Sequence, residues 1–313
     1  MTKKELIDCH THISPFIHNT PILSSKLINE MVDAEVVFKC ENFQKMGAFK
    51  MRGATNAIMQ LNASQKEKGV ITHSSGNFAQ ALSLAAKSLN VKAHIVMPEN
   101  APKVKVEAVK SYGGIITLCE STIEARENAS EKIVAETGAT FIHPSNNKDV
   151  IIGNSTASLE LLKDHPDLNY VVAPVGGGGL IAGTALAAHF FGTGCKVIGA
   201  EPKAVDDAFR SLQSGKIEKN ELTNTIADGL RTHLGDINFP IIQKYVESII
   251  TVEEEEIVTA MRLIYERLKI VVEPSSAVAL AAVLRQKELF KKKKIGVILS
   301  GGNVDLSRLP FTG

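Results

Sequence analysis

The chain has 313 residues, 44% of them hydrophobic, and a formal net charge of +1 at pH 7. This composition supplies a large core for one or two domains, and a near-neutral charge without a basic stripe argues against a nucleic-acid partner. The four cysteines, Cys9, Cys40, Cys119 and Cys195, are dispersed without a Cys-x-x-Cys pair, so we expect free thiols in a reducing compartment.

The N-terminal residues 1–17 contain no apolar segment of the kind that signal peptides have, which favours a cytoplasmic location. Residues 170–191 carry no formal charge and are long enough to span a bilayer. Pro174 and the glycines 176–179 interrupt them, so a buried strand, turn and helix are predicted there instead, without membrane contact.

Strand and helix patterns alternate along most of the chain. After helical spacing at 2–13 and 24–34, strands are predicted at 36–40, 69–72, 92–97, 114–118 and 139–142, and helices at about 77–89, 102–112 and 122–137. A second run has helices at about 151–164, 180–191, 238–246, 253–269 and 274–290, and strands at 170–175, 196–200, 248–252 and 294–299. Such alternation is typical of crossover helices and parallel sheets, so we predict an α/β protein of two units, each an open twisted sheet with helices on both faces.

Lys50 stands at the centre of Gly47-Ala-Phe-Lys-Met-Arg-Gly53. Apolar and small neighbours favour burial, and burial favours the neutral amine, the form that attacks a carbonyl. Alternatively, Lys50 lies on a helix with its stem packed and its ammonium in water.

The strand predicted at 170–175 runs directly into four consecutive glycines and then a helix. Backbone N–H groups of such a loop can converge on a phosphate at the helix N-terminus, although a tight turn is the simpler alternative. Gly177, Gly179 and Ala182 also fit a permissive G-x-G-x-x-A pattern, with Glu201 placed about 20 residues on as a ribose-binding acid would be. A nicotinamide-dependent oxidoreductase is therefore a competing hypothesis.

Two further turns follow predicted strands. Ser74-Ser-Gly-Asn77 offers hydroxyls, an amide and N–H groups suited to a carboxylate, and Ser300-Gly-Gly-Asn303 ends the last strand. Because the carboxyl ends of parallel strands share one edge, these turns indicate a ligand along the crest of the sheet.

A metal-based hypothesis starts from His10 and His12, which could form the H-x-H pair of an amidohydrolase-type site with His143 or His233. The surrounding residues have helical spacing, and positions i and i+2 of a helix point apart, which argues against it.

Taken together, these features resemble a known family. The lysine segment, the serine–asparagine turn, the glycine loop, Glu273-Pro274 and the last turn stand in the order found in the pyridoxal-phosphate enzymes of the serine racemase and serine/threonine dehydratase family, over nearly the whole chain. The resemblance implies fold type II, with a large cofactor-binding domain of residues 1–65 and 147–313, a small domain of residues 66–146, and the active site between them. It also implies a homodimer.

The resemblance further implies that Lys50 holds pyridoxal 5'-phosphate as a Schiff base. The other implied cofactor contacts are Phe49 and Gly229 for the ring faces, Asn77 for the ring hydroxyl, Gly176, Gly177, Gly178 and Gly179 for the phosphate, and Ser300 for the pyridine nitrogen. A neutral serine at that nitrogen makes the ring a weaker electron sink than a carboxylate would, which suits elimination over transamination.

The implied reaction is dehydration of a hydroxy amino acid, L-serine or L-threonine, to a 2-oxo acid and ammonia. Lys50 takes the α-proton, and Ser75 faces the other side of the substrate, where proton delivery would produce racemisation. Serine racemisation and threo-3-hydroxyaspartate dehydration are close alternatives. The substrate contacts carried over are Ser74, Ser75, Asn77, Arg126 and Thr232.

The family also binds a divalent cation at an acidic turn, and Glu201, the backbone of Val205 and Asp207 match that spacing. Oxygen ligands indicate magnesium or calcium, whereas the simpler alternative is two surface acids. The chain departs from the family at Phe78, where histidine is common, and at Gly153-Asn-Ser-Thr156, where glycine-glutamine-glycine-threonine is usual. The first departure leaves the substrate open.

Overall fold

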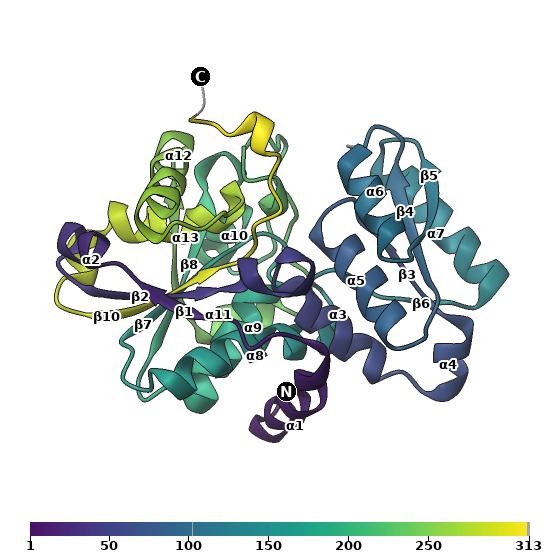
Figure 1. The fold of residues 1–313 in the computed structure, drawn as a ribbon, viewed down its shortest axis with the longest axis horizontal. Coiled ribbons are helices and arrows are strands. Elements are labelled where there is room, and N and C mark those ends of the chain that lie inside the picture. Colours follow the sequence, from purple (N-terminus) through teal and green to yellow (C-terminus); the bar gives the residue numbers. More distant parts are fainter. Residues whose placement is uncertain (102, 312–313) are drawn as a thin grey trace.

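The computed structural model describes residues 1–101 and 103–311, which form two sheets in adjacent units (Figure 1). The six-stranded sheet has the order β1 (Ile22–Ser24), β2 (Glu35–Cys40), β10 (Lys294–Leu299), β7 (Tyr170–Pro174), β8 (Lys196–Pro202), β9 (Val246–Val252). The four-stranded sheet has the order β5 (Ile115–Cys119), β4 (Ala93–Pro98), β3 (Val70–His73), β6 (Thr140–Phe141). Apart from the antiparallel β1–β2 pair, all the strand pairs of these sheets are parallel, which confirms the predicted fold class.

Helices cover both faces of each sheet. Their bounds are α1 (Lys3–Ile13), α2 (Lys26–Val32), α3 (Lys50–Met59), α4 (Ala63–Lys68), α5 (Asn77–Ser88), α6 (Lys103–Ser111), α7 (Ile123–Thr137), α8 (Lys148–Asp164), α9 (Gly179–Phe191), α10 (Asp207–Ser214), α11 (Phe239–Tyr245), α12 (Glu254–Leu263), α13 (Pro274–Arg285) and α14 (Lys287–Phe290). Among the described residues, none of these helices combines the length and apolar character that crossing a bilayer requires.

The period of two along each strand decides which helices it contacts. In β7, Val171 and Ala173 join the core formed with α8 and α9, while Val172 faces the opposite core with α13. Both faces are buried, so these strands read as continuous apolar runs. In the smaller sheet, Ile71 contributes to the core under α7, whereas Val70 belongs to the core shared with α5.

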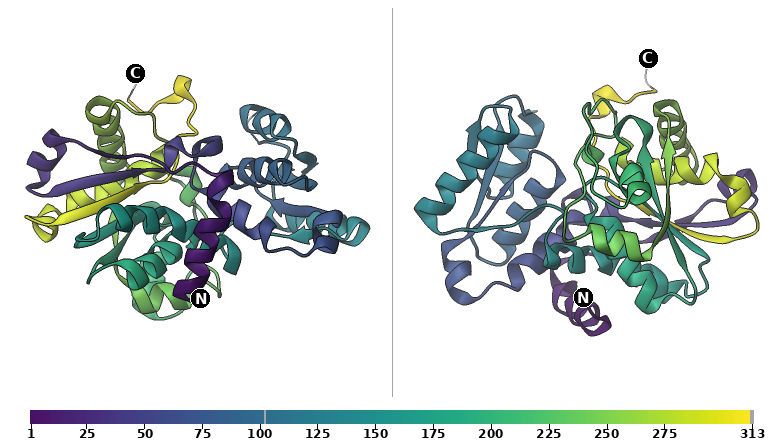
Figure 2. Two further views of the ribbon diagram at one scale, coloured as in Figure 1. Left: turned by 60° about the horizontal axis from the view of Figure 1, so that its bottom comes forward. Right: turned by 180° about the vertical axis from the view of Figure 1, so that it is seen from behind.

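The unit with the four-stranded sheet lies beside the larger unit in every view (Figure 2). All four of its strands fall within residues 66–146, but the domain boundaries themselves stay a prediction. α3 lies between the units and contacts both α5 and α8.

Four elements were not predicted: β1, α3, α4 and α10. The reason is clear for two of the helices. Phe49, at the N-cap of α3, makes no side-chain capping bond, so a local start signal is missing. The start of α10 is capped from a distance, because Glu201 accepts the N–H groups of Ala208 and Phe209. The first residue of the helix predicted at 102–112 lies outside the described residues. The single helix predicted at 274–290 is observed as two helices, α13 and α14.

Candidate active site

Lys50 is the first residue of α3, the helix that lies between the two units. Its Nζ donates to the carbonyl oxygen of Pro144 at 2.8 Å and lies 5.0 and 5.6 Å from the ring centroids of Phe49 and Phe78. Burial lowers the pKa of the Lys50 amine to about 8, against the opposing charge of Glu273. A sizeable fraction of the amine is therefore neutral near physiological pH and able to act as a nucleophile or base.

The end of β10 runs alongside the segment that leads into Lys50. The N–H of Phe49 donates to the carbonyl oxygen of Ser300 at 3.0 Å, and Ala48 and Gly301 form an antiparallel bridge. Ser300 is buried, with its Oγ 3.2 Å from that of Ser276. This pairing places Ser300 beside Phe49, the residue before Lys50.

The glycine loop connects β7 to α9. Gly178 has φ +80°, a conformation that glycine adopts without strain. The loop is buried, and among the described residues no acceptor receives the backbone N–H groups of Gly177, Gly178 and Gly179. Buried N–H groups are almost always paired, so unpaired ones at a helix N-terminus indicate a site for an anion.

Other loops surround these glycines closely. A Cβ placed on Gly177 would lie 2.4 Å from Oγ of Ser145 and 2.9 Å from Oγ1 of Thr232. A Cβ placed on Gly176 would lie 3.1 Å from the carbonyl oxygen of Gly229. The structure thus brings Thr232 and Gly229 next to the loop, while their roles at the substrate and at a ring face stay predictions.

Asn77 links the two units. Its Nδ2 donates to the two carboxylate oxygens of Glu273 at 2.9 and 3.0 Å, and its Oδ1 accepts from Nδ2 of Asn303 at 2.9 Å. Burial raises the pKa of Glu273 to about 7, although Asn77 stabilises the ionised form. The amide predicted to contact a ring hydroxyl is thereby held in one orientation by the last turn and by an acid.

The serine turn is partly open. The N–H of Gly76 donates to Oγ of Ser74 at 3.4 Å, and a Cβ placed on Gly76 would meet nothing within 4 Å. The turn therefore leaves free space beside Gly76. Arg126 is elsewhere, on α7, where its Nε donates to the carbonyl oxygen of Thr122. The structure does not show it in contact with the other predicted substrate residues.

Glu201 and Asp207 form a separate buried pair. Both oxygens of Glu201 accept backbone N–H groups, at 3.0 and 2.8 Å, so neither is presented to a ribose hydroxyl. Burial, and then the charge of Asp207, raises the pKa of Glu201. Burial also raises the pKa of Asp207 to about 6, and its Oδ2 has no hydrogen-bond partner.

Three of the four histidines in the metal hypothesis contact other groups. His10 lies on α1, 3.4 Å from a carboxylate oxygen of Glu160, while His143 Nδ1 accepts two backbone N–H groups and His233 Nε2 accepts one. Within residues 1–101 and 103–311, no three His, Cys, Asp or Glu residues are grouped as a metal site.

Sequence reasoning missed three contributors to the site: Pro144, Ser145 and the role of Glu273. His143-Pro-Ser-Asn146 marks a break between two runs of elements, and nothing in its pattern says that it returns to the lysine. The signal for Glu273 was its position before Pro274, where it was noted only as part of a motif.

Comparisons with known proteins identify the family. The family described as "Pyridoxal-phosphate dependent enzyme" matches residues 13–301. A serine racemase of Dictyostelium discoideum is 49% identical over 99% of this chain and 97% of its own, and a beta-hydroxyaspartate dehydratase of Paracoccus denitrificans is 46% identical over 99% and 98%. The structure of maize serine racemase superimposes with a TM-score of 0.95 at 48% identity, covering 97% of this chain and 94% of that one.

Proposed function

Since this chain belongs to the family of pyridoxal-phosphate dependent enzymes, we propose that it is a serine/threonine dehydratase that removes the α-proton and the β-hydroxyl of L-serine or L-threonine. The observation that carries the proposal is the buried Lys50 amine, with its pKa near 8, which binds the carbonyl oxygen of Pro144, next to the Ser145 that lies against a glycine loop with unpaired N–H groups. An amine and an anion cradle at one site are the two anchors that this cofactor requires.

The residues present fit the cofactor. Lys50 would hold it covalently, with Phe49 against one ring face and Gly229 near the other, and the glycines 176–179 would bind its phosphate. Asn77 would contact the ring hydroxyl and Ser300 the pyridine nitrogen. When bound, the cofactor supplies an electron sink for the negative charge left when the α-proton departs.

Side chains of the protein would then transfer the protons and bind the substrate. Once the substrate amine has taken the place of Lys50 on the cofactor, the freed Lys50 amine would take the α-proton, and its partial neutrality near neutral pH suits a base. Ser74, Ser75 and Asn77 bind the substrate carboxylate, with Thr232 beside the glycine loop. The Ser75 hydroxyl would carry a proton on the opposite face, which makes serine racemisation a second activity of the same site, in line with the similarity to a serine racemase.

Phe78 bears on the choice of substrate. It is 2% exposed and lies against the Lys50 amine, where it offers no hydrogen bond. An apolar wall there, together with Arg126 bound to its own helix, supports a neutral side chain such as that of serine over a second carboxylate. Hydroxyaspartate dehydration stays the alternative, because a beta-hydroxyaspartate dehydratase is among the similar proteins.

A divalent cation, magnesium or calcium, is part of the proposal, held by Glu201, the carbonyl of Val205 and Asp207. Two buried acids with raised pKa values, one of them with an unpartnered oxygen, fit a hard cation that would neutralise them. We also propose a cytoplasmic homodimer without a nucleic-acid or membrane partner. The four cysteines of the described chain are free thiols, as predicted, which agrees with a reducing compartment.

The test is an absorbance spectrum of the purified protein before and after each substrate, with the 2-oxo acid product and D-serine measured in the same samples. A band at the visible edge that shifts with L-serine or L-threonine while the oxo acid accumulates supports dehydration. Formation of D-serine without the oxo acid would assign serine racemisation instead. If threo-3-hydroxyaspartate is the only substrate that gives product, the activity is hydroxyaspartate dehydration. Protein supplied with cofactor that shows no band contradicts the whole proposal.

A further inference from the structure

Three helices connect the two anchors of the site. α3 carries Lys50 at its first residue, α9 begins at Gly179, and α8 packs against both helices. The phosphate and the reactive carbon of the cofactor belong to one rigid molecule. Both of its ends can therefore bind well only if the amine and the loop are held at the matching distance.

Glycines let these helices touch backbone to backbone. A Cβ placed on Gly153 of α8 would lie 2.5 Å from the carbonyl oxygen of Arg52 in α3. A Cβ placed on Gly183 of α9 would lie 2.8 Å from the carbonyl oxygen of Ile151 in α8. Neither crossing leaves room for a side chain, so α3, α8 and α9 are closely packed and can shift little relative to one another.

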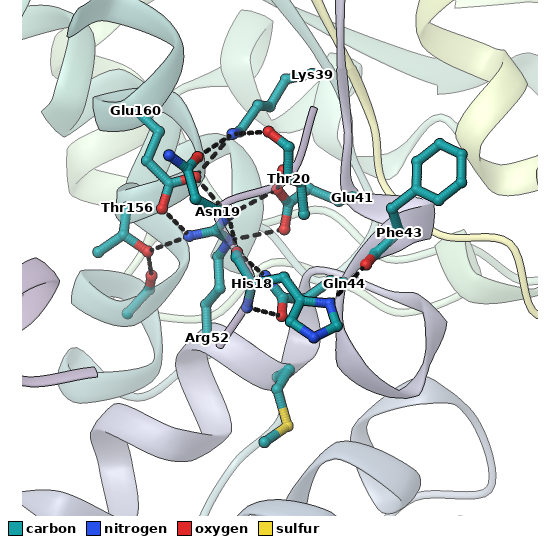
Figure 3. A network of polar contacts seen from close by, with 12 residues as sticks. His18, Asn19, Thr20, Lys39, Glu41, Phe43, Gln44, Arg52, Thr156 and Glu160 are labelled. Carbon is teal, nitrogen blue, oxygen red and sulfur yellow. Dashed lines mark hydrogen bonds and ion pairs between the residues drawn. The ribbon is translucent and has the colours of Figure 1, made fainter. Parts of the chain in front are cut away.

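Arg52, two residues after Lys50, holds α3 against α8 through ion pairs and hydrogen bonds (Figure 3). Its guanidinium binds both oxygens of Glu41 at 2.7 and 2.9 Å and both oxygens of Glu160 at 2.7 Å. It also donates to Oγ1 of Thr156 at 3.1 Å. Lys39 lies 2.7 Å from Glu160, so two cations face two acids in this cluster.

Stability alone is a weak explanation for this cluster. Arg52 is fully buried, and taking two such ion pairs out of water costs about as much as their attraction returns. Two bidentate pairs do, however, hold the guanidinium in a single orientation. The first turn of α3 needs such an external restraint, because its N-cap residue, Phe49, makes no side-chain capping bond.

We propose that Arg52 is a positioning residue, which locks the first turn of α3 onto α8 and so sets the spacing between the Lys50 amine and the phosphate-binding glycine loop. The proposal rests on the proposed function of Lys50 and of the loop. It concerns how the two anchors are held, and it adds no new contact with substrate or cofactor.

The test compares pyridoxal phosphate with pyridoxal, which lacks the phosphate. Each is added to protein freed of cofactor, and the rate of attachment to Lys50 is followed by absorbance and verified by reduction and peptide mass spectrometry. The ratio of the two rates measures how well the loop and the amine act together. Arg52→Lys keeps the charge but not the two bidentate pairs, and Gly153→Ala shifts the crossing without touching the charges.

For Arg52→Lys we expect the ratio to fall by about tenfold or more, while the rate with pyridoxal changes by less than about twofold. Gly153→Ala should lower the ratio in the same direction. Phe290→Leu, in the core on the other face of the sheet, is the control and should lower the unfolding temperature without changing the ratio.

An unchanged ratio in Arg52→Lys, despite a lower unfolding temperature, overturns the proposal and leaves the cluster a structural one. If Arg52→Lys does not fold, Gly153→Ala decides by the same criterion. Failure of the wild-type protein to attach either aldehyde at Lys50 contradicts the proposed function instead, so the two failures are distinguishable.

Discussion

Replacing Glu273 with glutamine tests whether the site carries a buried acid. Glu273 is 5% exposed, and burial raises its pKa from 4.5 to about 7 even though Asn77 donates to both of its oxygens. Glutamine has nearly the same shape and keeps one of the two oxygens that accept from Asn77. The substitution therefore removes mainly the ionisation, and the effect on the free energy of unfolding should depend on pH.

The sign follows from linkage. A carboxyl whose pKa is higher in the folded than in the unfolded state costs nothing below the unfolded pKa, and it destabilises the fold as pH rises through the folded pKa. For Glu273 that window runs from 4.5 to about 7, and the shift corresponds to roughly 3 kcal/mol. The transition of Lys50 lies above it, between about 8 and 10.5.

The assay is denaturant unfolding of the protein without cofactor at several pH values from 4.5 to 8, for wild type and Glu273→Gln. We expect the stability of the variant relative to wild type to rise by about 3 kcal/mol from pH 4.5 to pH 8. Glu67→Gln, on an exposed position of α4, is the matched control and should give a constant difference. A difference for Glu273→Gln that is equally constant would refute the reasoning.

Three further predictions concern the proposed ligands. Lys50→Ala should abolish the cofactor band at the visible edge, and a variant that stays yellow assigns the attachment to another amine. Gly179→Ala places a Cβ 2.9 Å from the Cα and the carbonyl oxygen of Ser145, so titration of cofactor-free protein should show affinity weakened by about tenfold or more; unchanged affinity contradicts the phosphate cradle. Removing divalent cations should lower the unfolding temperature by several degrees, reversibly with magnesium or calcium, in wild type but not in Asp207→Asn; a chelator without effect on wild type leaves the pair as buried acids.

The parallel sheets could be predicted because their strands are buried on both faces and read as apolar runs between turn residues. The strand predicted at 294–299 is observed at Lys294–Leu299, and the helix predicted at 77–89 at Asn77–Ser88. Elements that depend on contacts with residues far away in the sequence were not predicted. α10 starts where Glu201 reaches its first turn, a bond that no local pattern of residues contains.

The same division applies to the site. Residues that follow strands, such as the glycines 176–179, could be proposed because the carboxyl ends of parallel strands meet at one edge. Pro144, which receives the Lys50 amine, and Glu273, which orients Asn77, act across 94 and 196 residues of chain. Their roles depend on tertiary packing, and a period of two or of 3.6 residues carries no information about it.

The charge of Glu273 also acts on the Lys50 amine. The ionised carboxylate raises the pKa of Lys50 and so partly offsets the burial that lowers it to about 8. Near neutral pH, where Glu273 is half ionised, a shift of its proton therefore changes how much of the amine is neutral. The same acid accepts from Asn77 of the other unit, so it takes part both in the contact between the units and in setting the basicity of the lysine. In Glu273→Gln the pKa of Lys50 should consequently fall further, because only the burial remains.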